Sequence, residues 1–212
     1  TMSAIPVLRL HNGQAVCRRD VPVLSVGELR EVVFSSVKRG ARLAAFFGMP
    51  VGGEAVRLFA VLACGDTGDL SVASADVGNH YPALTPDCPQ VHWFEREIAE
   101  QWGVRPEDHP WLKPIRFHRS YRAGRDAWGR ADGEPILPSV TDYFQVDGEE
   151  IHEVAVGPVH AGVIEPGHFR FQCHGERVLH LEISLGYQHR GVERAMRGGP
   201  TPRSIHYMET LA

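Results

Sequence analysis

The stretch from Gly157 to Glu193 reads GPVHAGVIEPGHFRFQCHGERVLHLEISLGYQHRGVE. Apolar and polar residues alternate in its second half, which is the pattern of half-buried β-strands. Residues 169–173 form the first alternating run, a His-Gly-Glu turn follows, and residues 179–185 form the return run. We therefore predict a β-hairpin whose end loops carry histidines, a glutamate and an arginine.

The composition of the whole chain limits the class of protein. The chain has 212 residues, of which 43% are hydrophobic and 23% charged, as in a globular protein of one or two domains. The net charge of −4 and the lack of a Lys/Arg-rich run argue against a nucleic-acid partner. The longest apolar run, residues 58–64, is far shorter than the ~20 residues that span a bilayer. With no signal-peptide pattern and four cysteines outside any C-x-x-C, we expect a reduced, cytoplasmic protein.

The N-terminal half predicts a compact mixed domain. Ser25 and Glu28 form a capping box, and the helix that follows ends at Gly40. Strands are predicted at residues 5–10, 42–47, 56–64 and 70–75. This order of elements predicts an α+β fold, with a mixed or antiparallel sheet, helices on one face, an irregular linker and the β-hairpin extension.

A second helix is predicted to begin at Asp87-Cys88-Pro89-Gln90, with Asp87 as its cap and Gln90 completing the box. Its apolar face carries Phe94, Ile98 and Trp102, joined by Trp93, and Gly103 ends it. The opposite face is charged and predicted to be exposed. Its members are Glu95, Arg96, Glu97 and Glu100.

Periodicity fails between residues 113 and 150, first in an arginine-rich run and then in an acidic one. Such a stretch indicates a linker or a wrapping segment. We therefore predict domains at 1–112, a linker at 113–150 and a C-terminal piece at 151–212. A last helix begins after Thr201-Pro202, carries Ile205, Met208 and Leu211, and has no cap, so we expect a piece of a longer polypeptide. The exposed apolar face of the hairpin also predicts self-association.

Three motifs in the Gly157 stretch support a family resemblance: GP-x-H, EPGHFRF and G-x-x-HRG-x-E. Together they resemble the N-terminus of the large subunits of respiratory complex I (the 49-kDa or D subunit) and of membrane-bound, energy-converting nickel–iron hydrogenases. The Glu165-Pro166 dipeptide is more similar to the hydrogenase branch, which includes the formate hydrogenlyase and hydrogenase-4 large subunits. The resemblance covers about the last quarter of the chain.

This resemblance implies roles for several residues. Glu165 would be the catalytic proton acceptor, with His168 and His160 as partners in the loop that faces the metal or, in complex I, the quinone. From the residues alone, Glu-Pro-Gly favours a surface turn over a catalytic role. Residues near the iron–sulfur cluster of a partner small subunit would be Arg190, His189 and Glu193, with Glu193 holding Arg190 by an ion pair.

A second resemblance rests on Tyr81-Pro82, EREIAEQWG and His109-Pro110-x-Leu112. These residues are similar to the signature of the complex I 30-kDa (C) subunit, although Gln101 and Lys113-Pro114 depart from it. The family's usual tail motif is absent. The resemblance implies a fusion of a 30-kDa-like module with the start of a large subunit, and a subunit-docking role for Glu95, Arg96, Glu97, Glu100 and His109.

Three functions remain open at this stage. The first is part of an energy-converting hydrogenase or formate hydrogenlyase, peripheral on the inner membrane through partner subunits. The second is a complex I component of C/D type that serves quinone reduction, and the third is a noncatalytic docking module. Nickel–iron binding in this family needs two C-x-x-C pairs, which the chain lacks, so we expect it to bind no cofactor alone.

Overall fold

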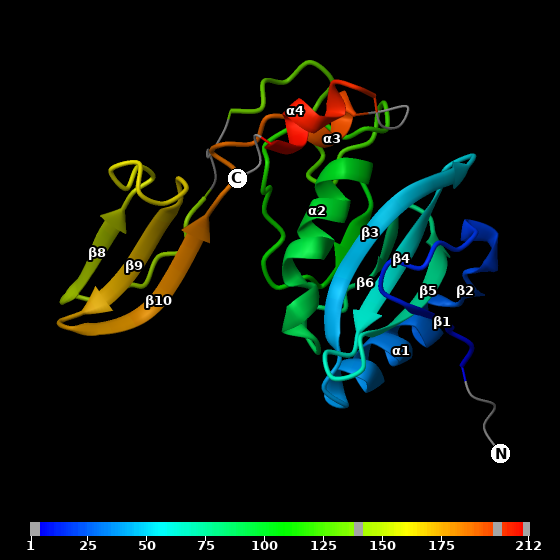
Figure 1. Ribbon diagram of the computed structural model, residues 1–212. Coiled ribbons are helices and arrows are strands. Elements are labelled where there is room, and N and C mark those ends of the chain that lie inside the picture. The colour runs from blue at the N-terminus through cyan, green and yellow to red at the C-terminus, as the bar shows by residue number, and fades with distance from the viewer. Residues whose placement is uncertain (1–4, 138–141, 197–200, 210–212) are drawn as a thin grey trace. The chain divides into compact units, whose positions relative to one another are not determined.

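The computed structural model describes residues 5–137, 142–196 and 201–209. The chain forms two compact units, residues 1–137 and 138–212, which are described separately. The first unit contains the predicted α+β domain, and the second contains the predicted hairpin (Figure 1). The predicted fold class is confirmed.

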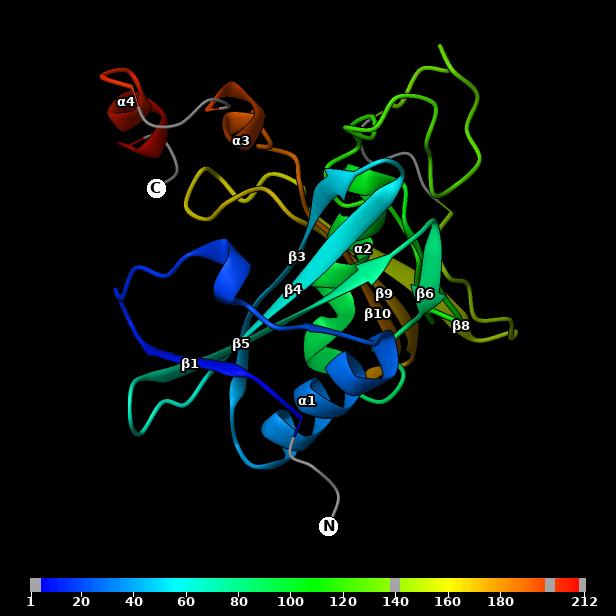
Figure 2. The same ribbon diagram turned by 90° about the vertical axis from the view of Figure 1, so that its right-hand side faces the viewer.

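A five-stranded sheet forms the framework of the first unit. Its strands follow the order β1-β5-β4-β3, and β2 lies parallel beside β5. The three long strands lie side by side in Figure 2 and pair antiparallel. The bounds are Leu8–His11 for β1, Val23–Leu24 for β2, Arg42–Gly52 for β3, Ala55–Ala63 for β4 and Asp69–Val77 for β5.

Two helices supply the rest of the core. Helix α1 (Val26–Lys38) starts with the predicted capping box, because Ser25 Oγ accepts from Glu28 N and Glu28 accepts from Ser25 N. Helix α2 (His92–Trp102) ends as predicted at Gly103, whose φ of 61° suits glycine. Leu29 and Val33 of α1 and Ile98 of α2 join one cluster with the sheet residues, so both helices cover the same face.

The predicted start of the second helix is wrong in its details. Residues Pro89–Val91 form a 3₁₀ turn, η2, and α2 begins only at His92. Asp87 does not cap this turn; its carboxylate pairs with Arg30 of α1. Gln90 Oε1 accepts from Leu43 N of β3 at 2.9 Å. Tertiary partners therefore take both side chains away from the helix terminus, a competition that local capping rules do not include.

Short elements complete the first unit. Residues Arg18–Asp20 form the 3₁₀ turn η1. Strands β6 (His80–Pro82) and β7 (Arg105–Glu107) pair in parallel. Strand β6 precedes α2 in the chain and β7 follows it, so their pairing brings the segments before and after the helix together. Residues 113–137 contain no helix or strand, as their lost periodicity predicts. They belong to the first unit, however, and this differs from the predicted boundary at residue 112.

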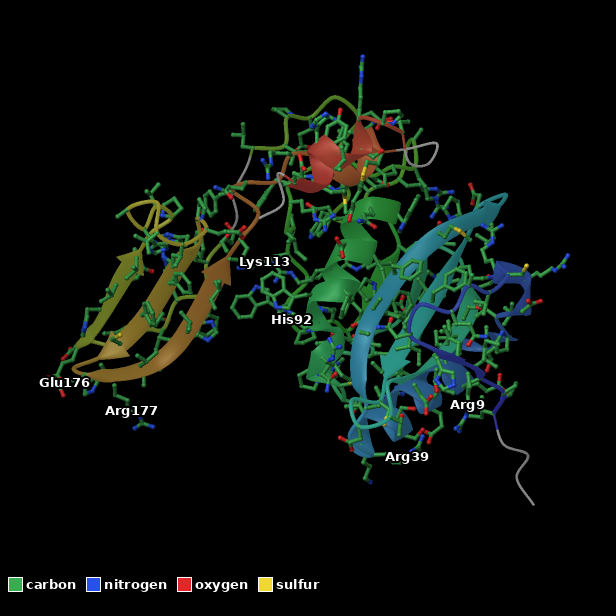
Figure 3. The ribbon with its side chains drawn as sticks, in the orientation of Figure 1. Arg9, Arg39, His92, Lys113, Glu176 and Arg177 are labelled. Atoms are coloured by element: carbon green, nitrogen blue, oxygen red, sulfur yellow. The ribbon has the colours of Figure 1, made fainter. Side chains whose placement is uncertain are left out.

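The second unit is built on a three-stranded antiparallel sheet in the order β10-β9-β8. Strands β9 (His168–His174) and β10 (Arg177–Ser184) form the predicted hairpin, and Glu176 and Arg177 mark its turn in Figure 3. Strand β8 (Ile151–Val156) was not predicted. Two short helices follow, α3 (Val192–Ala195) and α4 (Ser204–Glu209), while Leu211 of the predicted apolar stripe lies outside the described residues.

In this sheet the polar face is more buried than the apolar face. The register places Val154, Phe171 and Leu181 on one face, whereas Glu153, Gln172 and His180 lie on the other. The polar face is the better buried, with Gln172 4% exposed and Glu182 5% exposed, because residues 143–146 lie across it. On the apolar face, Val154, Val156 and Leu181 remain 41–42% exposed.

Candidate functional site

Residues 157–167 form a closed loop between β8 and β9. Gly157 has a φ of 88°, and a Cβ there would collide with the carbonyl oxygen of Gly167. Gly167 N donates to Pro158 O at 3.0 Å. His160 Nε2 donates to Gly167 O at 2.8 Å, and its ring packs edge-on against Phe169. His160, a predicted site residue, therefore fastens the base of the loop.

Glu165 lies on the exposed part of this loop. Its neighbours Val163 and Ile164 are 83% and 56% exposed, and Glu165 itself is exposed. Within the described parts of the chain, its carboxylate forms no hydrogen bond or ion pair. His168 begins β9, and its ring packs edge-on against Tyr143 at 5.6 Å. The loop thus presents the predicted acid outward, with no hydrogen bond or ion pair to His160 or His168 in the described parts of the chain.

The Arg190 region forms the turn that follows β10. His189 N donates to Gly186 O at 3.1 Å, and Gly191 adopts a left-handed φ of 67° before α3. Arg190 and Glu193 are exposed, and His189 is half-buried. The turn presents the predicted cation at a surface, as a contact with a partner would require.

Glu95 of α2 binds the loop that precedes the helix. Its side chain is 0% exposed, and its carboxylate accepts from Leu84 N at 2.8 Å, Thr85 N at 3.0 Å and Thr85 Oγ1 at 2.5 Å. Burial raises the pKa of Glu95, although these hydrogen bonds oppose that shift. The pKa of the buried Tyr81 phenol is also raised, first by burial and then by the Glu95 charge.

Glu100 binds the segment that follows the helix. Its side chain is 1% exposed. Oε2 accepts from Ile115 N at 3.2 Å and Arg116 N at 2.9 Å, while Oε1 accepts from Phe117 N at 2.7 Å. Phe117 has a φ of 58°, which helps three successive N–H groups converge on one carboxylate. One glutamate therefore fixes the course of residues 115–117.

Arg96 fastens the same segment. Its Nε donates to Lys113 O at 2.8 Å and its Nη2 to Pro114 O at 3.1 Å, and its guanidinium lies 4.7 Å from the Trp93 ring centroid. Figure 3 shows Lys113 close to the His92 end of α2. Glu97 is half-buried and pairs with Arg116. Residues 113–117 therefore pack along α2 through charged contacts.

His109 has an internal role as well. Its ring stacks on His92, with centroids 5.3 Å apart. Nδ1 accepts from Trp111 N at 3.0 Å, so Nε2 carries the proton that faces His92 O at 3.4 Å. Burial and the charge of His92 lower the pKa of His109 from 6.5 to about 4. The ring is thus neutral near pH 7.

The predicted exposure of the charged helix face is wrong. Glu95, Arg96 and Glu100 are buried, while Trp93, predicted on the apolar face, is 37% exposed. A helical projection could have found Glu95, which adjoins the face of Phe94 and Ile98. For Arg96 and Glu100 the sequence contains no such signal. Residues 113–117, which lie outside the helix and have no periodicity of their own, cover them. Their role in subunit docking stays a prediction.

The described ranges 5–137, 142–196 and 201–209 contain no group of three or more His, Cys, Asp or Glu side chains arranged to hold a metal ion. All four cysteines are free thiols; Cys17 and Cys64 are exposed, and Cys88 and Cys173 are buried. None of the helices in these ranges is long and apolar enough to cross a bilayer.

Comparison with known proteins gives consistent relatives. Residues 59–136 match the family described as respiratory-chain NADH dehydrogenase, 30 Kd subunit. Hydrogenase-4 component G of Escherichia coli (strain K12) is 33% identical over 123 residues, which is 54% of this chain and 22% of the relative. Formate hydrogenlyase subunit 5 of the same organism is 31% identical over 129 residues, covering 54% of this chain and 21% of the relative.

The C/D subunit of the NADH-quinone oxidoreductase of Shewanella oneidensis is 26% identical over 146 residues, covering 59% of this chain and 24% of the relative. The chain therefore spans about a fifth to a quarter of the length of these relatives. The matched family region includes the second half of β4 and all of β5 and α2, together with the segment that Glu100 and Arg96 fasten.

Proposed function

We propose that the chain is a component of a multi-subunit oxidoreductase complex of the hydrogenase or formate hydrogenlyase kind. The observation that carries this proposal is its similarity to hydrogenase-4 component G and formate hydrogenlyase subunit 5, at 33% and 31% identity. The identity to the C/D subunit of the NADH-quinone oxidoreductase is lower, at 26%. The Glu165-Pro166 dipeptide, typical of the hydrogenase branch, favours the same choice.

The second candidate is a component of an NADH-quinone oxidoreductase. It is favoured by the match of residues 59–136 to the 30 Kd subunit family. In that function the loop at residues 157–167 would face a quinone, and His160 and His168 would be its polar residues. The two candidates share the same architecture and differ in the reaction of the assembled complex.

The second unit supplies the surface for assembly. The apolar face of β8, β9 and β10 carries partly exposed valine and leucine side chains, and exposed apolar faces of this kind indicate protein contacts. We infer that this face packs against another part of the complex. The polar face has no such need, because residues 143–146 already cover it.

Glu165 would be the catalytic acid of the assembled complex. Its loop is fastened at the base, and the exposed carboxylate at residue 165 can enter a neighbouring site without refolding. Burial in that site would raise the pKa of the carboxyl group toward the working pH and suit it to proton transfer. A nickel–iron centre would belong to other parts of the complex, and the iron–sulfur cluster beside Arg190 would belong to a small partner subunit.

The experiment is purification of the native complex through a tag on this protein, from its own host and in mild detergent. We expect an iron–sulfur protein to copurify, and hydrogen evolution from reduced viologen to exceed NADH-driven quinone reduction. Val154→Lys combined with Leu181→Lys should abolish copurification, because two charges would be buried in an apolar contact. The matched control is Val23→Lys, which changes an exposed valine of the first unit.

Two results would contradict the proposal. Copurification that survives the paired lysine variant would show that the apolar sheet face is not the assembly surface. Quinone reduction without hydrogen evolution, in a complex with its full set of subunits, would assign the protein to the second candidate.

A further inference from the structure

A small cavity of about 90 Å³ lies in the segment that follows α2. Charged side chains dominate its lining, with four arginines and two aspartates, so the formal charge of the lining is positive by two. The charged residues are Arg119, Arg122, Arg125, Arg130, Asp126 and Asp132.

Two of the arginines are held by groups that carry no charge. Arg122 donates from Nη1 to Trp102 O at 3.1 Å and from Nη2 to Glu54 O at 2.7 Å. Arg119 Nη2 donates to Glu134 O at 2.5 Å. Main-chain carbonyls orient both guanidinium groups without neutralising them, so their positive charge remains available to an anion.

The other two arginines have carboxylate partners, Glu54 outside the lining of the cavity and Asp126 within it. Arg125 pairs with Glu54, and Arg130 pairs with Asp126 at 2.7 Å. Asp126 Oδ1 also accepts from Trp128 N at 2.9 Å and Arg130 N at 3.2 Å, so this carboxylate is well satisfied. Burial and the nearby Arg125 charge lower the pKa of Arg122. With Glu54 included, the group still has an excess of positive charge.

The cavity has room for a small anion. Its volume of about 90 Å³ is several times the roughly 10–15 Å³ that a cavity needs to hold one water molecule. This is enough for one tetrahedral oxyanion. Guanidinium forks match phosphate oxygens in pairs, and the several oxygens of a tetrahedral phosphate can bind more of the four arginines than the two oxygens of a carboxylate can.

We propose that this cavity binds a phosphate group. The ligand is either free inorganic phosphate or the terminal phosphate of a small phosphomonoester, which present the same oxygens to the arginines. The site is independent of the oxidoreductase function proposed above, because it uses only residues 119–136 and their contacts in the first unit.

The test is calorimetric titration of the full 212-residue chain with inorganic phosphate, at constant ionic strength set with chloride. We expect saturable binding at one site. Arg119→Gln should weaken it about tenfold, as expected for one lost charge-assisted pair. Arg125→Gln should weaken it as well, and Arg119→Lys should fall between Arg119→Gln and the unchanged protein. The control is Arg9→Gln, which removes an exposed charge from β1 (Figure 3).

Two further ligands complete the experiment. Glycerol 1-phosphate, compared with free phosphate, identifies the source: tighter binding of either one supports the site and assigns the ligand. Acetate binding as tightly as phosphate would overturn the proposal, because it would show a general affinity for anions. Equal weakening by Arg9→Gln and Arg119→Gln, or no saturable phosphate binding in a folded chain, would also overturn it.

Discussion

Replacing Glu100 by alanine should destabilise the first unit strongly. The buried carboxylate accepts three backbone hydrogen bonds from residues 115–117. Hydrogen bonds to a charged group contribute about 1.5–3 kcal/mol each, so their sum is at most about 9 kcal/mol. Ile115 and Arg116 are only half-buried, so water can reach part of the freed backbone. We therefore expect a loss of about 3–5 kcal/mol in the free energy of unfolding.

The measurement is urea unfolding of the full chain, followed by tryptophan fluorescence, since Trp93, Trp111 and Trp128 surround this region. The control on the same helix is Glu97→Ala, which removes a partly exposed ion pair with Arg116 and should cost at most about 1 kcal/mol. Hydrogen exchange adds a local test, because the amides of residues 115–117 should lose protection only in Glu100→Ala. Equal stability of the two variants, with protected amides in both, would refute the reasoning.

Two further predictions concern titration and catalysis. Because the pKa of His109 is lowered to about 4 in the folded chain, its stabilisation is complete above about pH 6.5 and is lost as the pH falls toward 4. Between pH 7 and 5 the free energy of unfolding should fall by about 1 kcal/mol on this account, after allowance for solvent screening. Urea unfolding at both pH values measures this loss, which should be absent in His109→Gln and kept in the exposed His80→Gln control. Glu165→Gln in the assembled complex should leave the protein composition of the complex unchanged and lower turnover by ~10²–10⁴-fold, as expected for a lost general acid. Glu176→Gln, at the exposed hairpin turn, is its control, and near-normal hydrogen evolution by Glu165→Gln would return Glu165 to a turn role.

The elements that local rules decide were predictable from the sequence. The Ser25–Glu28 capping box, the Gly103 helix end and the β9–β10 alternation each depend on residues within a few positions of one another, and all three are confirmed. The start of α2 was not predictable in this way. Asp87 and Gln90 have partners in α1 and β3, 57 and 47 residues away, and such partners leave no local pattern.

In the candidate site, too, local features were predictable and features that depend on distant partners were not. The sequence located the loop of Glu165 and the turn of Arg190, but it could not show that His160 fastens its own loop. Strand β8 was missed because the acidic run before it suggested a linker, and its pairing with β9 depends on residues about 20 positions away. The charged face of α2 was predicted to be exposed and to dock a partner subunit, because a run of charged residues usually lies at a surface. Its true partner, residues 113–117, lacks any periodicity.

These corrections change where a partner can bind. A charged helix face that is exposed offers specificity through its charges, but Glu95, Arg96 and Glu100 already satisfy backbone groups of their own chain. A partner that claimed them would leave those groups unpaired, at a cost that a surface contact rarely recovers. The apolar sheet face of the second unit carries no such obligation, since Val154, Val156 and Leu181 gain only from being covered. Assembly through the sheet face, as we propose, would therefore break none of these hydrogen bonds, and we expect the first unit to keep its internal contacts in the proposed complex.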